Sequence, residues 1–256
     1  MDRRSHCRPP MHDKHDSLRR FGPRAQSYAA FRPGYPAQAV EAALQGLGDA
    51  SALTIADIGA GTGISSRLFA QRGAKVIAVE PNERMRAQAQ PHPNVEWREG
   101  SAQQTGLPDK SVDLVVVCQA FHWFATPQTM LELARIARRR VAILQYERDE
   151  RDPFTKAYGD VVRAYATDDT EALRARGLEA FSCFPGARIA RAAAYFDQPL
   201  DREGLLGRAA SSSYLPASGQ RADALRRDLH ALFDEHEREG SVTMQMVTHV
   251  VTAALI

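Results

Sequence analysis

The sequence predicts an α/β fold in which helices cover both faces of a mostly parallel sheet. Strand and helix alternate repeatedly between residues 52 and 145, and the strands are largely apolar runs such as Val112–Cys118, in which Asp113 is the one charged residue. Parallel strands buried on both faces have this composition, and each crossover between them needs room for a helix. A chain of 256 residues with a hydrophobic fraction of 44% can fill the core of one large domain.

The expected elements follow one another at short intervals. A first helix begins at Pro36, whose ring suits a first helical turn, and carries an apolar stripe as far as Leu47. The expected strands of the alternating part span 52–58, 74–79, 95–98, 112–118 and 141–145, and its helices span 65–72, 83–90 and 129–138. Later segments are expected to be helical within 152–177, 201–210 and 221–238, and extended at 188–196 and 242–253. Together these elements predict a doubly wound, seven-stranded sheet with a helical insertion.

Composition and charge exclude several kinds of partner. With 33 basic and 31 acidic residues the net charge is +2, so neither a nucleic acid nor a membrane is expected as a partner. There is no signal peptide, no apolar run long enough to span a bilayer, and no C-x-x-C spacing for zinc. We therefore expect a cytoplasmic protein, as a monomer or homodimer.

The first 26 residues differ from the rest of the chain. They are rich in Arg, His, Asp and Pro and poor in large apolar side chains, so we expect a tail that is flexible at least in part. This tail is either dispensable, including a start at Met11, or it folds over a bound ligand. Residues 27–256 are expected to form the domain.

A glycine-rich loop follows the first expected strand. Its glycines fall at positions 59, 61 and 63, whereas the dinucleotide fingerprint is G-x-G-x-x-G, and Ile64 stands where that third glycine would be. Asp57, two residues before the first glycine, would repel a diphosphate. A ligand with a positive centre and no phosphate would tolerate this carboxylate. S-adenosylmethionine, which carries an ammonium and a sulfonium, is such a ligand.

A second acid, Glu80, ends the next strand about 20 residues beyond the loop. A carboxylate at this point can bind a ribose diol, as it does in nicotinamide-dependent enzymes, so Glu80 alone does not distinguish the two ligands. The other interpretation is a solvated acid at a strand end.

The loop resembles the first motif of class I S-adenosylmethionine-dependent methyltransferases, with its D-x-G-x-G-x-G pattern. Two further strings, Gln119-Ala-Phe-His-Trp-Phe124 and Tyr28-Ala-Ala-Phe-Arg32-Pro-Gly-Tyr35-Pro36, resemble the branch that includes trans-aconitate methyltransferase-like and related small-molecule methyltransferases. A looser resemblance continues in Leu200–Arg208 and the following Ser212-Ser-Tyr214.

This resemblance implies a Rossmann-like fold and methyl transfer from S-adenosyl-L-methionine to a small-molecule acceptor, with S-adenosyl-L-homocysteine as the product. It leaves open whether oxygen, nitrogen or carbon is methylated. Segments at about 27–36 and 147–215 would form a lid and the acceptor pocket. The alternatives are a non-catalytic protein that binds either of these two compounds, and a nicotinamide-dependent oxidoreductase, which the glycine spacing and Asp57 disfavour.

The expected cofactor-binding residues lie in the strings quoted above and in the loop at 99–108. They are Tyr28, Arg32, Asp57, Gly59, Ala60, Gly61, Gly63, Glu80, Pro81, Met85, Ser101, Ala102, Gln103, Gln119, Phe121 and His122. By the resemblance, Met85 packs on the adenine unless it is simply a core residue, and Ser101 replaces the usual acid of the adenine loop. Arg32 could pair with the carboxylate of the cofactor, or Arg-Pro could merely shape a turn.

His122 is the candidate general base, because the pKa of an unperturbed histidine lies near neutrality. A contact with the cofactor and a core position are the alternatives for this residue. No metal is expected, because acidic residues are not clustered near the end of Val112–Cys118, where hard oxygen ligands would be needed.

Overall fold

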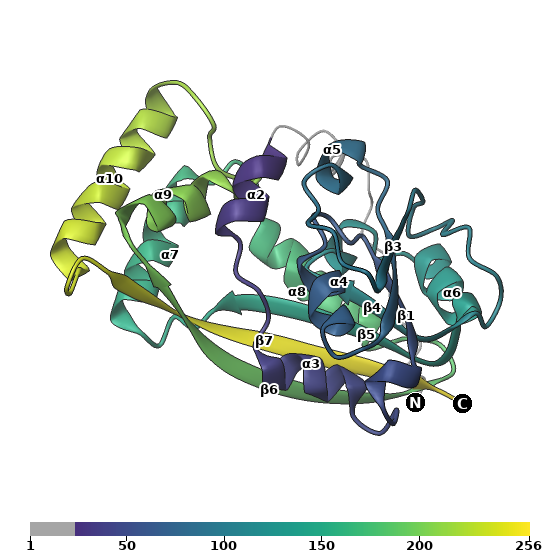
Figure 1. Cartoon of the computed structure of the whole chain (residues 1–256). Helices are drawn as coiled ribbons and strands as arrows, with labels where there is room; N and C mark the ends of the chain where they lie inside the picture. Colours follow the sequence, from purple (N-terminus) through teal and green to yellow (C-terminus); the bar gives the residue numbers. More distant parts are fainter. Residues whose placement is uncertain (1–23) are drawn as a thin grey trace.

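The computed structural model describes residues 24–256, so the expected tail lies outside the described residues up to position 23. One sheet with strand order β3-β2-β1-β4-β5-β7-β6 forms the centre of the described part (Figure 1). The strands are β1 (Thr54–Ile58), β2 (Lys75–Val79), β3 (Val95–Arg98), β4 (Val112–Cys118), β5 (Ala137–Arg148), β6 (Ala187–Leu200) and β7 (Val242–Leu255).

Helices and short 3-10 turns connect these strands. The helices are α2 (Ala25–Phe31), α3 (Ala37–Leu44), α4 (Ile64–Ala70), α5 (Glu83–Arg86), α6 (Pro127–Ile136), α7 (Pro153–Tyr165), α8 (Thr170–Phe181), α9 (Arg202–Ala210) and α10 (Gln220–His236). The 3-10 turns are η3 (Ala50–Ala52) and η4 (Phe121–Trp123). Within residues 24–256, none of these helices is both long and apolar enough to cross a bilayer.

The sheet is parallel from β3 to β5, and β7 runs antiparallel to both of its neighbours, β5 and β6. This confirms the predicted doubly wound, mostly parallel, seven-stranded sheet. The strand order reverses beside β1, where β2 lies on one side and β4 on the other. Ligands of open α/β sheets bind at such a switch point, outside the carboxyl ends of the strands.

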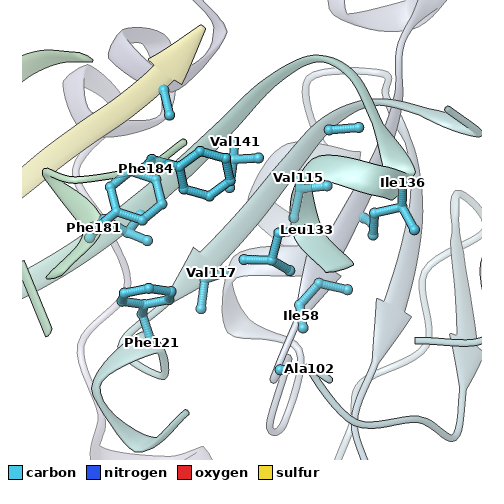
Figure 2. Close-up of a cluster of buried hydrophobic side chains, with 14 of the residues drawn as sticks. Ile58, Ala102, Val115, Val117, Phe121, Leu133, Ile136, Val141, Phe181 and Phe184 are labelled. Atoms are coloured by element: carbon cyan, nitrogen blue, oxygen red, sulfur yellow. The ribbon is translucent and has the colours of Figure 1, made fainter. Parts of the chain in front are cut away.

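Side chains of β4 alternate between two cores, because successive residues of a strand point to opposite faces. Val115 and Val117 join the cluster that holds Phe181 of α8 (Figure 2). Leu114 and Val116 join the cluster beneath α3 and α4. The apolar run of β4 therefore reflects burial on both faces, as its sequence predicts.

A third apolar cluster lies where β5, β6 and β7 extend beyond the rest of the sheet. It packs α7, α9 and α10 around residues such as Tyr146, Leu205, Leu229 and Met244. Figure 1 shows these helices grouped around one end of the long strands. Tyr146 of this cluster also lines the site described below.

Helices α5 and α6 both end earlier than the sequence predicts. Helix α5 ends at Arg86 rather than near residue 90, and Pro91 soon follows, which cannot continue a helix. Helix α6 ends at Ile136, and the basic run that follows belongs to β5. There Arg139 and Arg140 donate to carbonyl oxygens in and just beyond the last turn of α3. The C-terminal end of a helix favours cations, because its last carbonyl groups carry a partial negative charge.

Candidate functional site

A cavity of about 320 Å³ opens at the carboxyl ends of β1, β2 and β4. This volume lies at the lower end of the range for cofactor and substrate pockets. The lining residues are Tyr28, Pro33, Tyr35, Gly59, Ala60, Gly61, Thr62, Ile64, Ser65, Glu80, Pro81, Asn82, Met85, Ser101, Ala102, Gln103, Cys118, Gln119, Ala120, Trp123, Phe124 and Tyr146. The position is the one that the switch point of the sheet predicts.

The glycine loop turns its backbone amides toward the protein. The amides of Gly59 and Ala60 donate to the carbonyl oxygen of Val79 at 2.9 and 3.2 Å. The amide of Gly63 donates to Ala60 at 2.9 Å, and that of Gly61 donates to the Glu80 carboxylate at 2.9 Å. A loop that cradles a diphosphate instead points such amides at the ligand.

Asp57 is fully buried beneath the N-terminal end of α4. One of its carboxylate oxygens accepts hydrogen bonds from the hydroxyls of Ser65 and Ser66, each at 2.6 Å. Burial raises the pKa of Asp57, and these serine hydrogen bonds partly oppose that effect. A helix N-terminus favours a negative group, and here a side chain of the protein itself supplies it.

Glu80 connects the end of β2 to the glycine loop. Its two oxygens accept the amides of Gly61 and Asn82, each at 2.9 Å. Burial raises the pKa of Glu80, and these hydrogen bonds oppose that effect only in part. Each carboxylate oxygen has a second lone pair, so Glu80 can still accept hydrogen bonds from a ligand in the cavity.

Aromatic side chains close the side of the cavity nearest α2. Tyr28, Tyr35 and Tyr146 line it together, and the rings of Tyr35 and Tyr146 lie 5.6 Å apart at a tilt of 51°. These tyrosines come from α2, from the segment before α3, and from β5. Segments far apart in the sequence therefore meet over the cavity.

The opposite side of the cavity is formed by α5 and the loop after β3. Met85 is buried against the glycine loop, so that a Cβ on Gly61 would lie 3.2 Å from the Met85 Cε. Gly61 also has a φ of +60°, which favours glycine. The Ser101–Gln104 turn is closed by hydrogen bonds between the backbone groups of its two ends. The wall is thus apolar at Met85 and polar at the turn.

Most of the residues expected from the sequence line this cavity. They are Tyr28, Gly59, Ala60, Gly61, Glu80, Pro81, Met85, Ser101, Ala102, Gln103 and Gln119. The remaining expected residues, which lie behind the wall or beside it, are Arg32, Asp57, Gly63, Phe121 and His122. Phe121 packs edge-to-face on Phe181 in the core. A Cβ on Gly63 would lie 2.7 Å from the Trp97 ring.

His122 is almost completely buried, with an exposed fraction of 2%. Its ring lies 4.8 Å from the ring of Trp123, and it lines a small cavity beside the main one. Gly177 of α8 packs on its backbone, because a Cβ there would lie 3.0 Å from the His122 Cα. The histidine, which belongs to η4, is therefore held against α8.

Other lining residues were not among the expected cofactor contacts. They are Pro33, Tyr35, Thr62, Ile64, Ser65, Asn82, Cys118, Ala120, Trp123, Phe124 and Tyr146. Cys118 and Tyr146 lie at or near the carboxyl ends of their strands, which is a signal readable from the sequence. Asn82 caps α5 two residues after Glu80. Within residues 24–256, no three His, Cys, Asp or Glu side chains are grouped as metal ligands would be.

Residues 56–144 match the family described as methyltransferase domain. Over 145 residues the chain is 33% identical to an uncharacterised methyltransferase of Mycobacterium tuberculosis, covering 56% of this chain and 58% of that protein. A methyltransferase-like protein of Schizosaccharomyces pombe, also uncharacterised, is 31% identical over 155 residues, covering 59% and 60%. The matched stretch thus spans less than two thirds of either relative.

Solved structures agree with the fold. A provisionally assigned type II methyltransferase from Anaeromyxobacter dehalogenans has a TM-score of 0.63 at 24% identity, covering 88% of this chain and 97% of that one. A provisionally assigned methyltransferase from an antibiotic biosynthesis pathway of Anabaena variabilis has a TM-score of 0.54 at 27% identity, covering 77% and 90%.

Proposed function

We propose that this chain, whose residues 56–144 match the family described as methyltransferase domain, transfers a methyl group from S-adenosylmethionine to a small-molecule acceptor. The observation that carries the proposal is the buried carboxylate of Asp57 beneath α4. A dinucleotide places its diphosphate at the N-terminus of the corresponding helix. Here two serine hydroxyls of that helix already bind Asp57, so a ligand without phosphate fits the loop better.

The cavity residues suit the parts of this cofactor. Glu80 is placed to accept hydrogen bonds from the ribose hydroxyls. Met85 offers an apolar surface to the adenine, and Ser101 and Gln103 offer polar groups to its edge. Gln119 and Tyr28, on the opposite side, would hold the methionine end. The carboxylates of Asp57 and Glu80 also favour a ligand with positive centres.

When bound, S-adenosylmethionine supplies a methyl carbon that its sulfonium has already activated. The work left to the protein is to orient the acceptor and to exclude water. Tyr35 and Tyr146 line the cavity as a tilted pair, and together with Tyr28 they would shield it. Closure by the segments at about 27–36 and 147–215 belongs to the same proposal.

His122 would act as a general base only for an acceptor that must lose a proton before it is methylated. His122 lines the small cavity, which shares Tyr28, Gln119 and Trp123 with the main cavity. A base in this position serves an acceptor that extends into the small cavity. A role in fixing Trp123 through the ring contact at 4.8 Å remains the alternative, and a pH profile of kcat in His122→Gln distinguishes the two.

Calorimetry with S-adenosylhomocysteine and NAD tests the cofactor. We expect binding of S-adenosylhomocysteine and no heat with NAD; the reverse result would contradict the proposal. Methyl transfer is then assayed with a panel of carboxylic acids, phenols and amines, using cofactor with a labelled methyl group. Binding without transfer to any member of the panel would instead support the non-catalytic alternative.

A further inference from the structure

Two small cavities, each of about 20 Å³, adjoin the main cavity. Both are lined by Arg32, Arg174 and Tyr214. The second of the two also shares Tyr28, Gln119 and Trp123 with the main cavity, and the first shares Tyr146 with it and is lined by Arg208. We refer to the residues Arg32, Arg174, Arg208, Tyr146 and Tyr214 as the arginine pocket.

Arg208 is buried without a carboxylate partner among the described residues. Its exposed fraction is 6%. Its Nε donates to the Met244 sulfur at 3.2 Å and its Nη2 to the Met246 sulfur at 3.6 Å, while Nη1 has no partner within residues 24–256. Thioether sulfur is a weak acceptor, and a buried charge is costly unless it is paired.

The other two arginines of the pocket also retain unused donors. The Nε atoms of Arg32 and Arg174 are buried and have no hydrogen-bond partner in the described part of the chain. Arg32 does donate through Nη2 to the carbonyl of Ser211 at 3.1 Å and to the hydroxyl of Ser212 at 3.4 Å. Both acceptors are neutral, so the guanidinium charge is not balanced by them.

Two acidic residues at the pocket have partners of their own, and both Glu147 and Arg148 line the first small cavity. Glu171 pairs with Arg148 and lies 3.5 Å from Arg163. Glu147 accepts a hydrogen bond from His249 at 2.7 Å. Among the described residues, the first small cavity is thus lined by four arginines and one carboxylate, that of Glu147.

Two buried tyrosines report the positive potential of the pocket. Burial alone would raise the pKa of Tyr146, but the charges of Arg32, Arg208 and Arg174 and a hydrogen bond with Arg32 together outweigh burial, and the net pKa is lowered. The pKa of Tyr214 is likewise lowered, because Arg174 and neighbouring arginines outweigh its burial. An anion in the pocket would therefore meet a favourable field.

We propose that the arginine pocket binds an oxyanion of the methyl acceptor, a carboxylate or a phosphate. Guanidinium groups match the geometry of both oxyanions. Each small cavity is large enough for about one water-sized group, so an oxygen of the anionic end would enter it while the rest of the group stays at its mouth. The rest of the acceptor would extend past Tyr146 into the main cavity, toward the cofactor. This inference rests on the proposed methyltransferase function.

Binding of small anions tests the pocket directly. The probes are succinate and methyl phosphate, with succinamide as the neutral match, at constant ionic strength. Binding is followed from the melting temperature, both with saturating S-adenosylhomocysteine and without it. We expect at least one of the two anions to raise the melting temperature of the wild type, and succinamide to leave it unchanged. A response to succinate indicates a carboxylate, and one to methyl phosphate a phosphate.

Arg208→Met keeps the volume of the side chain and removes the charge. We expect its apparent affinity for the anion to fall about 10- to 100-fold, as for the loss of charged hydrogen bonds. Its melting temperature without ligand should stay the same or rise, because an unpaired buried charge is gone. The matched control is Arg226→Met on α10, whose arginine is exposed and pairs with Asp223, and which should respond as the wild type does.

Three results would overturn the inference. One is no response of the wild type to either anion, and another is an unchanged anion response in Arg208→Met. The third is a parallel loss of the anion and S-adenosylhomocysteine responses in a folded Arg208→Met, which would assign the pocket to the carboxylate of the cofactor. Failure of the wild type to bind S-adenosylhomocysteine would instead count against the proposed function, since the anion response is also measured without it.

Discussion

Phe31 packs directly on Gly207, so closely that a Cβ on this glycine would lie 2.5 Å from the Phe31 Cγ. Phe31 is the last residue of α2, the helix that carries Tyr28 to the cavity. Gly207 belongs to α9, which also carries Arg208. The wall of the cavity near Tyr28 is therefore positioned by a helix from the later part of the chain.

Gly207→Ala should weaken binding of S-adenosylhomocysteine several-fold, although Gly207 does not line the cavity. The added methyl group overlaps the Phe31 ring and must displace α2, at a cost of about 1–3 kcal/mol in the free energy of unfolding. Calorimetry and urea denaturation measure the two effects. Gly34→Ala is the control, because the nearest atom to its Cβ would lie 4.0 Å away. Equal affinities of both variants and the wild type would contradict this role of α9.

Glu80→Ala should weaken binding of S-adenosylhomocysteine by roughly 1–3 kcal/mol, the cost of leaving hydrogen-bonding groups unpaired. The variant loses the acceptor for the Gly61 amide as well as the acceptor proposed for the ribose. Calorimetry gives the difference in dissociation constants. Glu96→Ala removes an exposed acid of β3 that pairs with Arg98, and should have no effect. A folded Glu80→Ala with the affinity of the wild type would refute the ribose assignment.

Asp57→Asn should gain stability relative to the wild type as pH rises. Burial raises the pKa of Asp57, so the folded state binds this proton more tightly than the unfolded state does. The contribution of Asp57 to the free energy of unfolding is then greatest below about pH 4 and falls as pH rises toward the raised pKa. Asparagine does not titrate. Urea denaturation of both proteins from pH 4 to 7 measures the difference, and a flat or shrinking difference would disprove the assignment.

Bound S-adenosylhomocysteine should slow amide hydrogen exchange in the Tyr28–Tyr35 segment and in part of Asp152–Gly177. A cover that excludes water must open for ligands to enter, and such segments are usually among the less stable parts of a structure. Exchange is compared with and without the ligand, using α3 as an internal reference. Equal protection in both states would make both segments fixed walls. A response of the first segment alone would make the second segment part of the scaffold of the acceptor pocket.

Methyl transfer should not require a divalent metal. The end of β4 carries Cys118 and Gln119 rather than a group of carboxylates, and hard divalent ions prefer several oxygen ligands. The rate is measured before and after treatment with excess EDTA, using an acceptor identified from the panel. Loss of the rate with EDTA and its recovery with magnesium would contradict the expectation.

The strand pattern was predictable because burial on both faces leaves a direct trace in the sequence. Val112–Cys118 is apolar except for Asp113 and forms β4 with the same bounds. The end of α6 was not predictable in the same way. Arg138 and its neighbours read as the basic end of a helix, yet they lie in β5, where Arg139 and Arg140 bind carbonyls near the end of α3. Tertiary contacts of this kind override local preference.

For the candidate site, the sequence predicted which positions along strands and loops lie at the cavity, but it did not predict the directions of the side chains. Glu80 was placed at the cavity from its strand-end position alone. Arg32 was expected toward the cofactor, but its Nη2 contacts Ser211 and Ser212 in a later segment, and the cofactor assignment of Arg32 stays a prediction. The pairing of segments so distant in sequence has no local signal, which is also why the arginine pocket emerged only from the structure.

The antiparallel strand β7 lies between β5 and β6 but comes after both in the chain. On the ribosome, synthesis proceeds from the N-terminus at roughly 5–20 residues per second. The parallel strands from β3 to β5 can pair as soon as they emerge, whereas β6 has no neighbour until β7 has been made. Closure of the sheet is therefore a late event.

The order of synthesis also affects the walls of the site. Arg208 contacts Met244 and Met246, which are residues of β7. During translation the nascent chain can thus complete the glycine loop well before its acceptor side. Until β7 arrives, the outer edge of β5 is an unpaired strand edge that other chains could join, so this interval is the one in which a chaperone would matter most.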